Sequence, residues 1–224
     1  MRGCGSASHS IHLKPLAEDA LSLPVRTGKA RVIGIEPASL VTKSLVREVK
    51  TDDAGCFQSA LNPGLTKIAV IERHKRTGKL GIGILEGYGL TGGAIATTIS
   101  HDSHNIVVAG DNDPDMLLAV RELADMGGGI VSVHGGAIRR LPLPIAGLMT
   151  SADPQEVNCR PSRYARCRAC GTPVSPKTSN RSMTLSFMAL PVIPELKLTA
   201  RGLFNVNTFS FVGVEATDEV RHAQ

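Results

Sequence analysis

The amino-acid sequence predicts an α+β protein in which strands outnumber helices. Short runs of Ile, Val and Ala recur along the 224 residues, and glycine or polar clusters separate them. Only one segment combines helical spacing of apolar residues with residues that begin and end a helix. Apolar residues make up 42% of the chain and Trp is absent, so the core must rest on Ile, Val, Leu and Met. A chain of this length can bury such a core.

The expected strands are short apolar runs bounded by Gly, Pro or polar residues. They are residues 31–36, 40–49, 67–72, 94–100, 106–109, 130–134 and 137–141. The last two predict a hairpin across Gly135-Gly136. Residues 51–64 are rich in turn formers and predict a loop. Residues 78–93 carry seven glycines, a density that lets backbones approach closely or turn, and no strand is expected there.

One helix is expected to begin at Asp113. Asp113 can cap this helix, and Pro114 suits its first position. Three apolar residues follow at helical spacing: Leu117, Val120 and Ala124. Gly127 supplies the signal that ends the helix.

Charge and composition bear on the partners and the compartment. The formal net charge is +5, and Lys and Arg gather at residues 73–79 and 160–168. Aromatic residues make up only 3% of the chain, too few to stack on bases between these cations, so we expect no nucleic-acid partner. The five cysteines are irregularly spaced and odd in number, which is not a disulfide framework and suits a reducing compartment.

The sequence also bears on membrane association and export. Residues 1–6 carry no apolar core behind their charge, so we expect no secretory signal. No apolar run approaches the ~20 residues that a membrane helix needs. We therefore expect a soluble, cytoplasmic protein without a membrane partner.

Two motifs suggest a ligand site but also have simpler interpretations. Gly87-Tyr-Gly-Leu-Thr-Gly92 has the spacing of a dinucleotide-binding loop, but that loop must open a helix and a strand-like stretch follows here. We interpret these residues as turn glycines. Cys159, Cys167 and Cys170 offer three thiols, whereas a structural zinc needs four ligands. A fourth ligand could come from Cys56 or His222; the simpler interpretation is three incidental cysteines in a loop.

The most informative cluster is the polar run between the strands expected at 94–100 and 106–109. It consists of five residues that can hydrogen-bond or titrate: His101, Asp102, Ser103, His104 and Asn105. Such side chains are costly to bury without a ligand, a metal or mutual pairing, which favours a site. A polar turn with Asp102 bound to its own backbone is the alternative. Arg73 and His74, at the end of another strand, could face the same cleft or be a solvated strand end.

Several segments of this sequence resemble the C-terminal domain of adenine deaminase. They are KIAVIERH at 67–74, GYGL at 87–90, GAIA at 93–96, SHDSHNI at 100–106, LPLPIAGLM at 141–149 and MTLSFMALPVIPELKLT at 183–199. Residues 31–35 are similar to the strand that opens that domain, and the match runs in order over most of residues 30–212. The resemblance implies mixed, mostly antiparallel β-sheet layers with few helices. It also implies that residues 1–29 are a connector from an upstream α/β metal barrel absent from this chain, and that residues 213–224 are a tail.

The resemblance further implies an enzyme of the amidohydrolase superfamily, which converts adenine and water to hypoxanthine and ammonia. In that family a manganese or iron centre in the barrel lowers the pKa of a bound water, and a carboxylate or His protonates the departing amine. The barrel ligands begin with a His-x-His, and no two histidines here are separated by one residue. We therefore expect this chain to hold no metal itself.

The resemblance implies that this domain closes the active site of that enzyme. His101, Asp102 and His104 are then the expected catalytic residues. The expected substrate contacts are Ser103, Asn105, Arg73 and His74. The implied partners are adenine and an amidohydrolase barrel, in cis or in trans, and assembly into a homo-oligomer is left open. The alternative is a non-catalytic purine-binding or interaction module that kept the fold and lost the chemistry.

Residues 158–182 depart from the family pattern, which has an amphipathic helix and a short connector there. They hold six Arg or Lys, three Cys and three Pro, a composition typical of disorder and of a local change of reading frame. We expect limited digestion with trypsin to cut first at residues 160–168, because this segment cannot bury enough apolar surface to offset the entropy of ordering it. Protection of these arginines, or zinc bound at one equivalent, would contradict the disordered interpretation.

Overall fold

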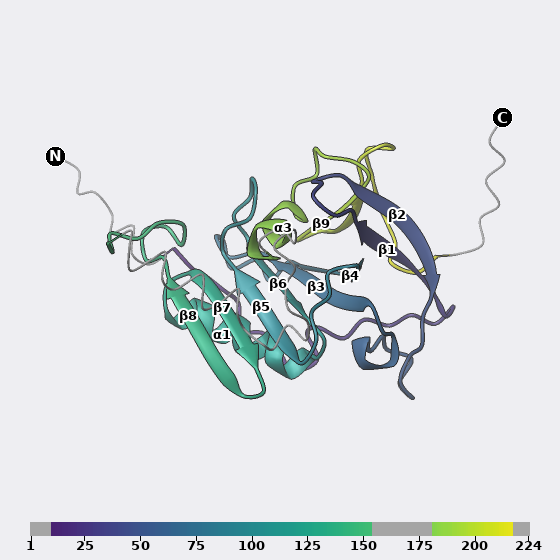
Figure 1. The fold of residues 1–224 in the computed structure, drawn as a ribbon, viewed down its shortest axis with the longest axis horizontal. Coiled ribbons are helices and arrows are strands. Elements are labelled where there is room, and N and C mark those ends of the chain that lie inside the picture. The colour runs from purple at the N-terminus through teal and green to yellow at the C-terminus, as the bar shows by residue number, and fades with distance from the viewer. Residues whose placement is uncertain (1–9, 154–180, 217–224) are drawn as a thin grey trace.

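The structure is a computed structural model that describes residues 10–153 and 181–216. The expectations for Cys159, Cys167 and Cys170, for His222, and for most of the atypical segment lie outside these residues. The described part is an α+β fold with mostly antiparallel sheets, as the sequence predicts (Figure 1). The only long helix within it is α1 (Asp113–Asp125).

An eight-stranded sheet forms the centre of the fold. Its strands are β1 (Lys29–Ile35), β2 (Thr42–Glu48), β3 (Leu65–Ile71), β4 (Leu80–Glu86), β5 (Gly93–Thr97), β6 (Ile106–Gly110), β7 (Gly129–His134) and β8 (Ala137–Pro142). Their order across the sheet is β2-β1-β4-β3-β6-β5-β7-β8, and only β1 and β4 pair in parallel. The hairpin of β7 and β8 turns at Gly135-Gly136, as predicted.

A second, smaller layer follows residue 180. It consists of the short helix α3 (Arg181–Phe187) and a three-stranded sheet of β9 (Leu196–Thr199), β10 (Gly202–Asn205) and β11 (Ser210–Val212). The remaining short element is the 3-10 helix η1 (Ser59–Leu61), which precedes β3.

Strand β4 was missed because its glycines conceal the apolar pattern of a strand. A Cβ atom at Gly81 would lie 2.1 Å from the carbonyl oxygen of Thr199 and 2.9 Å from the amide nitrogen of Gly202. A Cβ atom at Gly83 would meet the side chain of Leu203 at 3.3 Å. These glycines therefore sit inside a strand and let the turn between β9 and β10 approach its backbone.

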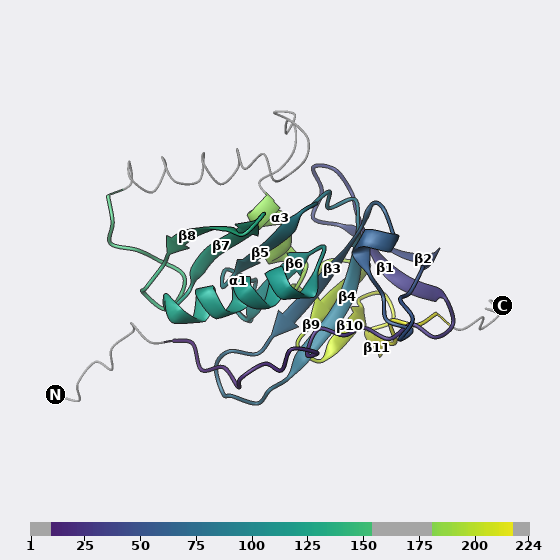
Figure 2. The same cartoon turned by 90° about the horizontal axis from the view of Figure 1, so that it is seen from below.

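The two faces of the large sheet carry separate apolar cores. On one face α1 packs with Met116, Val120 and Leu123 against β5, β6 and β7. On the other face α3 and the three-stranded sheet cover the strands through Leu185, Leu198 and Leu203 (Figure 2). Alternate residues of β3 point to opposite cores, as period-two alternation requires.

The ends of the described part pack closely on the large sheet. Residues 10–28 have little regular structure, yet Leu21, Leu23 and Val25 are buried. Val214 accepts a hydrogen bond from the Arg31 amide at 2.7 Å, and further bonds reach β1 from residues 213–216. The first half of β1 is therefore paired with the last described residues, and β4 pairs with the second half, at residues 33–34.

The start of α1 differs from the expectation that Asp113 caps it. Asn112 is the N-cap, and its side-chain oxygen accepts a hydrogen bond from the Asp115 amide at 2.8 Å. Asp113 lies one position inside the helix, where its carboxylate pairs with the buried Lys67 ammonium at 2.6 Å. The helix ends before Gly127, whose φ of +79° suits the expected stop.

A buried lysine in β9 gives a testable pH dependence. Lys197 is fully buried, and its ammonium donates to the carbonyl oxygen of Leu40 at 2.8 Å. Burial lowers the pKa of Lys197 from 10.5 to about 8. Between these two values the unfolded chain binds more protons than the folded chain, so this residue makes the free energy of unfolding rise with pH.

We therefore expect Lys197→Met to raise the unfolding temperature at pH 7 and to weaken the gain in stability between pH 8 and 10.5. Thermal unfolding followed by circular dichroism across this range measures both effects. The control is Lys79→Met, because Lys79 is exposed. Identical pH dependence in the two variants would contradict this account of Lys197.

Candidate functional site

The polar run forms a tight turn between β5 and β6. The His104 amide donates to the carbonyl oxygen of Ser100 at 2.6 Å, and His104 has a left-handed φ of +46°. Asp102 and Ser103 are exposed at the tip, whereas His101, His104 and Asn105 are partly buried. The backbone of residues 101–105 therefore forms a turn, as one of the two interpretations of the sequence predicts. Its side chains remain candidate site residues.

Helix α3 holds one side of this turn. The His101 amide donates to the carbonyl oxygen of Ser186 at 3.1 Å. The His101 ring lies 4.6 Å from the ring of Phe187 and 6.1 Å from the ring of His104, measured between centroids. Phe187, more than 80 positions later in the sequence, thus lies beside the two imidazoles of the turn.

Arg73 and His74, at the end of β3, hold the turn through its backbone. The His74 ring donates from Nε2 to the carbonyl oxygen of Ser103 at 2.8 Å. Arg73 donates from Nε to the carbonyl oxygen of His104. Arg73 is only 2% exposed, so the structure places it behind the turn. Both predicted residues therefore meet the cluster, and both contact its carbonyl groups.

The loop that carries His74 is organised by Glu72. Burial raises the pKa of Glu72, but hydrogen bonds from Thr77, His74 and Lys75 to the carboxylate outweigh it and lower the pKa to about 2. The two donors of Thr77 are its amide at 3.0 Å and its hydroxyl at 2.8 Å. Glu72 is therefore ionised at neutral pH and fixes the backbone from which His74 reaches Ser103.

The electrostatics of the turn favour a neutral imidazole at His104. Burial lowers the pKa of His104, and the nearby charges of His101 and Arg73 lower it further, against the opposing effect of Asp102. A neutral imidazole has one nitrogen that can accept a proton and one that donates a hydrogen bond. At neutral pH His104 can therefore serve in proton transfer.

Within residues 10–153 and 181–216, Ser100 Oγ and Asn105 Oδ1 are buried and have no hydrogen-bond partner. Such atoms are rare in folded proteins, and a catalytic role or a bound water or ion is among their explanations. Asn105 was predicted from the sequence as a substrate contact. The sequence pattern does not single out Ser100, although it directly precedes the polar run and this adjacency is a signal for it.

The glycine-rich loop before β5 binds an internal carboxylate. The amides of Gly92 and Gly93 both donate to Asp111, the second at 2.9 Å. Gly87, Gly89 and Gly92 have positive φ values, as turn glycines do, and the loop runs into β5. The amides that a phosphate would need are thus occupied by Asp111.

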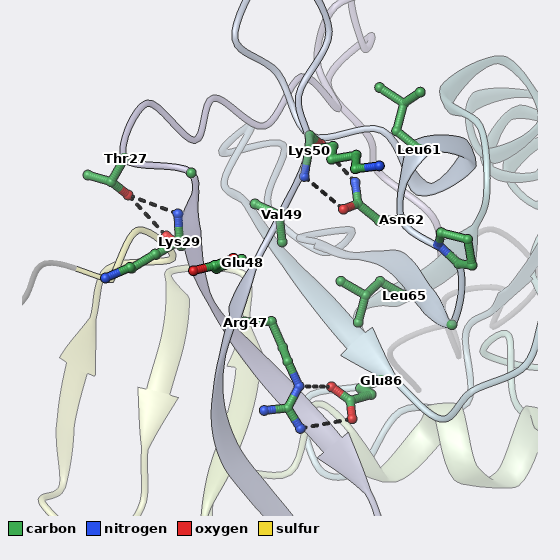
Figure 3. A pocket seen from close by; sticks show the side chains of 13 residues that line it. Thr27, Lys29, Arg47, Glu48, Val49, Lys50, Leu61, Asn62, Leu65 and Glu86 are labelled. Atoms are coloured by element: carbon green, nitrogen blue, oxygen red, sulfur yellow. Dashed lines mark hydrogen bonds and ion pairs between the residues drawn. The ribbon is translucent and has the colours of Figure 1, made fainter.

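A groove of about 780 Å³ lies away from the turn, beside β2 and the segment before β3 (Figure 3). Arg47 spans it with two hydrogen bonds to Glu86, at 2.7 and 3.0 Å. The Lys50 amide donates to the Asn62 side chain at 2.8 Å. None of the predicted site residues lines this groove, and two of its charged side chains, Arg47 and Glu86, pair with each other.

The described residues contain neither a cluster of metal ligands nor a membrane-spanning helix. Within residues 10–153 and 181–216, no three His, Cys, Asp or Glu side chains gather in a way that could hold a metal ion. In the same part of the chain no helix is long and apolar enough to cross a membrane.

Comparison with known proteins places this fold and turn in a family. The family described as the adenine deaminase C-terminal domain matches residues 39–210. This chain belongs to that family.

The curated relatives are proteins named adenine deaminase. That of Nitratidesulfovibrio vulgaris Hildenborough is 53% identical over 206 residues, which cover 92% of this chain and 35% of the relative. Adenine deaminase 2 of Carboxydothermus hydrogenoformans is 44% identical, with 92% and 36% covered. The Clostridium acetobutylicum protein is 43% identical with the same coverage. The chain thus spans about a third of the length of these relatives.

Proposed function

We propose that this chain is the C-terminal part of an adenine deaminase and closes the active site over adenine. Adenine deaminase hydrolyses adenine to hypoxanthine and ammonia. The proposal is supported by relatives of that name at 43–53% identity. The observation that supports the site most strongly is the turn at 101–105, which gathers two imidazoles and a carboxylate. Beside them, buried polar atoms of Ser100 and Asn105 have no partner among the residues that the structure describes.

The chemistry assigned to this chain is proton transfer and substrate contact. Hydrolysis at C6 of the purine needs a proton for the departing amine, and His101, Asp102 and His104 are the groups of the turn that can carry one. Ser103 and Asn105 can bind the ring nitrogens and N–H groups of the purine. The manganese or iron of the family would activate the water, but the described residues offer no ligand set. We therefore assign no step through a metal to this chain.

The isolated chain is expected to lack deaminase activity. Purified chain supplied with manganese or iron and adenine should release no ammonia above a blank, because its sequence lacks the His-x-His with which the metal ligands of the barrel begin, and without the metal no water is activated. Ammonia release measured by a coupled assay, with metal analysis of the same sample, tests this. Steady turnover with tightly bound metal would place the reacting centre in this chain and contradict the proposal.

The role of the turn is tested in a hybrid, defined as this 224-residue chain joined to the upstream two thirds of the N. vulgaris enzyme. We expect His101→Ala or Asp102→Ala to lower kcat by about 10²–10⁴-fold, the usual effect of losing a proton-transfer group. Metal content should stay unchanged, and the unfolding temperature should change little. Asp125→Ala, an exposed carboxylate at the end of α1, is the control.

The alternative outcome is equally specific. If His101→Ala and His104→Ala both keep full turnover per folded molecule while melting early, the cluster is only a structural turn. Adenine binding to the isolated chain without any effect of these variants on hybrid turnover would instead favour a purine-binding module.

A further inference from the structure

Arg73 is a buried cation whose hydrogen bonds go to neutral groups. Burial lowers its pKa, but a guanidinium keeps its proton under all ordinary conditions. Within the described residues it forms no ion pair with a carboxylate. An unpaired buried charge is costly, so this arrangement persists only because its N–H groups are well satisfied.

Those N–H groups join three separate segments. Nε donates to the carbonyl oxygen of His104 in the turn, and Nη2 donates to that of Ala146 at 3.0 Å. Nη1 donates to the hydroxyl of Ser10 at 2.8 Å and to its carbonyl oxygen at 3.2 Å. The Arg73 carbonyl oxygen also accepts from the His12 amide at 2.7 Å. One side chain therefore connects the turn to residues 10–12 and to the loop at 145–149.

The loop at 145–149 leaves room for this guanidinium. A Cβ atom at Gly147 would lie 3.0 Å from Arg73 Nη1 and 3.2 Å from Thr98 Oγ1, and Gly147 has a φ of +73°. The Thr98 hydroxyl donates to the Gly147 carbonyl oxygen and accepts from the Gly129 amide at 2.8 Å. The position of the guanidinium is thus fixed from the loop side as well as from the turn side.

We propose that Arg73 is a positioning residue: it fixes the shape of the 101–105 turn and makes that shape depend on residues 10–12 and 145–149. This inference rests on the proposed function of the turn. It differs from the expectation that Arg73 contacts substrate: the side chain is 2% exposed, and each of its three nitrogens donates at least one hydrogen bond within the protein. Lysine cannot replace it, since a single ammonium cannot bond three carbonyl groups in a fixed fork.

The first test uses the 224-residue chain and hydrogen exchange followed by NMR. Arg73→Lys should speed exchange of the His104 amide at least about tenfold relative to the amides of β6, because the turn loses the bond that holds the His104 carbonyl. Arg76→Lys is the matched control, three positions away and exposed. Unchanged exchange at His104 in Arg73→Lys would overturn the inference.

The second test uses the hybrid and separates kcat from KM. We expect Arg73→Lys to lower kcat about 10–100-fold with KM for adenine within about twofold, because a misplaced catalytic group slows chemistry. Ser10→Ala removes only the hydroxyl that accepts from Arg73, so it disturbs folding less than a change at Arg73. It should also lower kcat, but by a smaller factor than Arg73→Lys. A rise in KM alone would make Arg73 a substrate ligand. Normal kcat per folded molecule with early melting would make its role merely structural.

The outcomes distinguish this inference from the proposed function. If His101→Ala and Asp102→Ala leave kcat unchanged, the turn does no chemistry and the proposed function fails. If those variants lose activity while Arg73→Lys keeps it, the proposed function stands and the positioning role of Arg73 is overturned.

Discussion

The arrangement of this molecule depends on the close approach between β4 and the turn that joins β9 to β10. Gly81 has no side chain to separate the two backbones, and Gly83 gives Leu198 and Leu203 room to pack against the sheet. The same contact determines where α3 lies, because α3 precedes β9 and shares its apolar core. Since α3 bonds His101 through Ser186, packing at the middle of the sheet affects the candidate site where β5 ends and β6 begins.

The parts of the fold that follow local patterns were predictable from the sequence. The runs at 31–36, 67–72, 94–100 and 106–109 correspond to strands, and Gly127 follows α1, because alternation, period and end signals are local properties. Strand β4 was not predictable, because its glycines make room for a sheet that lies more than 100 residues later in the sequence. Helix α3 was missed because Pro191 and Pro194 follow it closely, which conceals where one element ends and the next begins.

The candidate site shows the same division between local and long-range information. The polar run at 101–105 stands out because its residue types disagree with their apolar surroundings. Its support does not stand out: Phe187 and Ser10 lie far away in sequence, and nothing local indicates that Arg73 is buried. The two interpretations of the run also prove compatible, because the backbone bonds of a turn leave its imidazoles and its amide oxygen for another use. Burial of His104 adds to this by disfavouring its charged form.

The pairing of β1 has a consequence for synthesis of the chain. The second half of this strand bonds to β4, but its first half bonds to residues 213–216. A ribosome makes β1 long before it makes those partners, so half of one edge stays open while the rest of the sheet forms. Open strand edges pair readily with other chains. A nascent chain that stops before residue 213 therefore carries an unprotected edge, and residues 213–216 are the ones that protect this half of β1 from pairing with another chain.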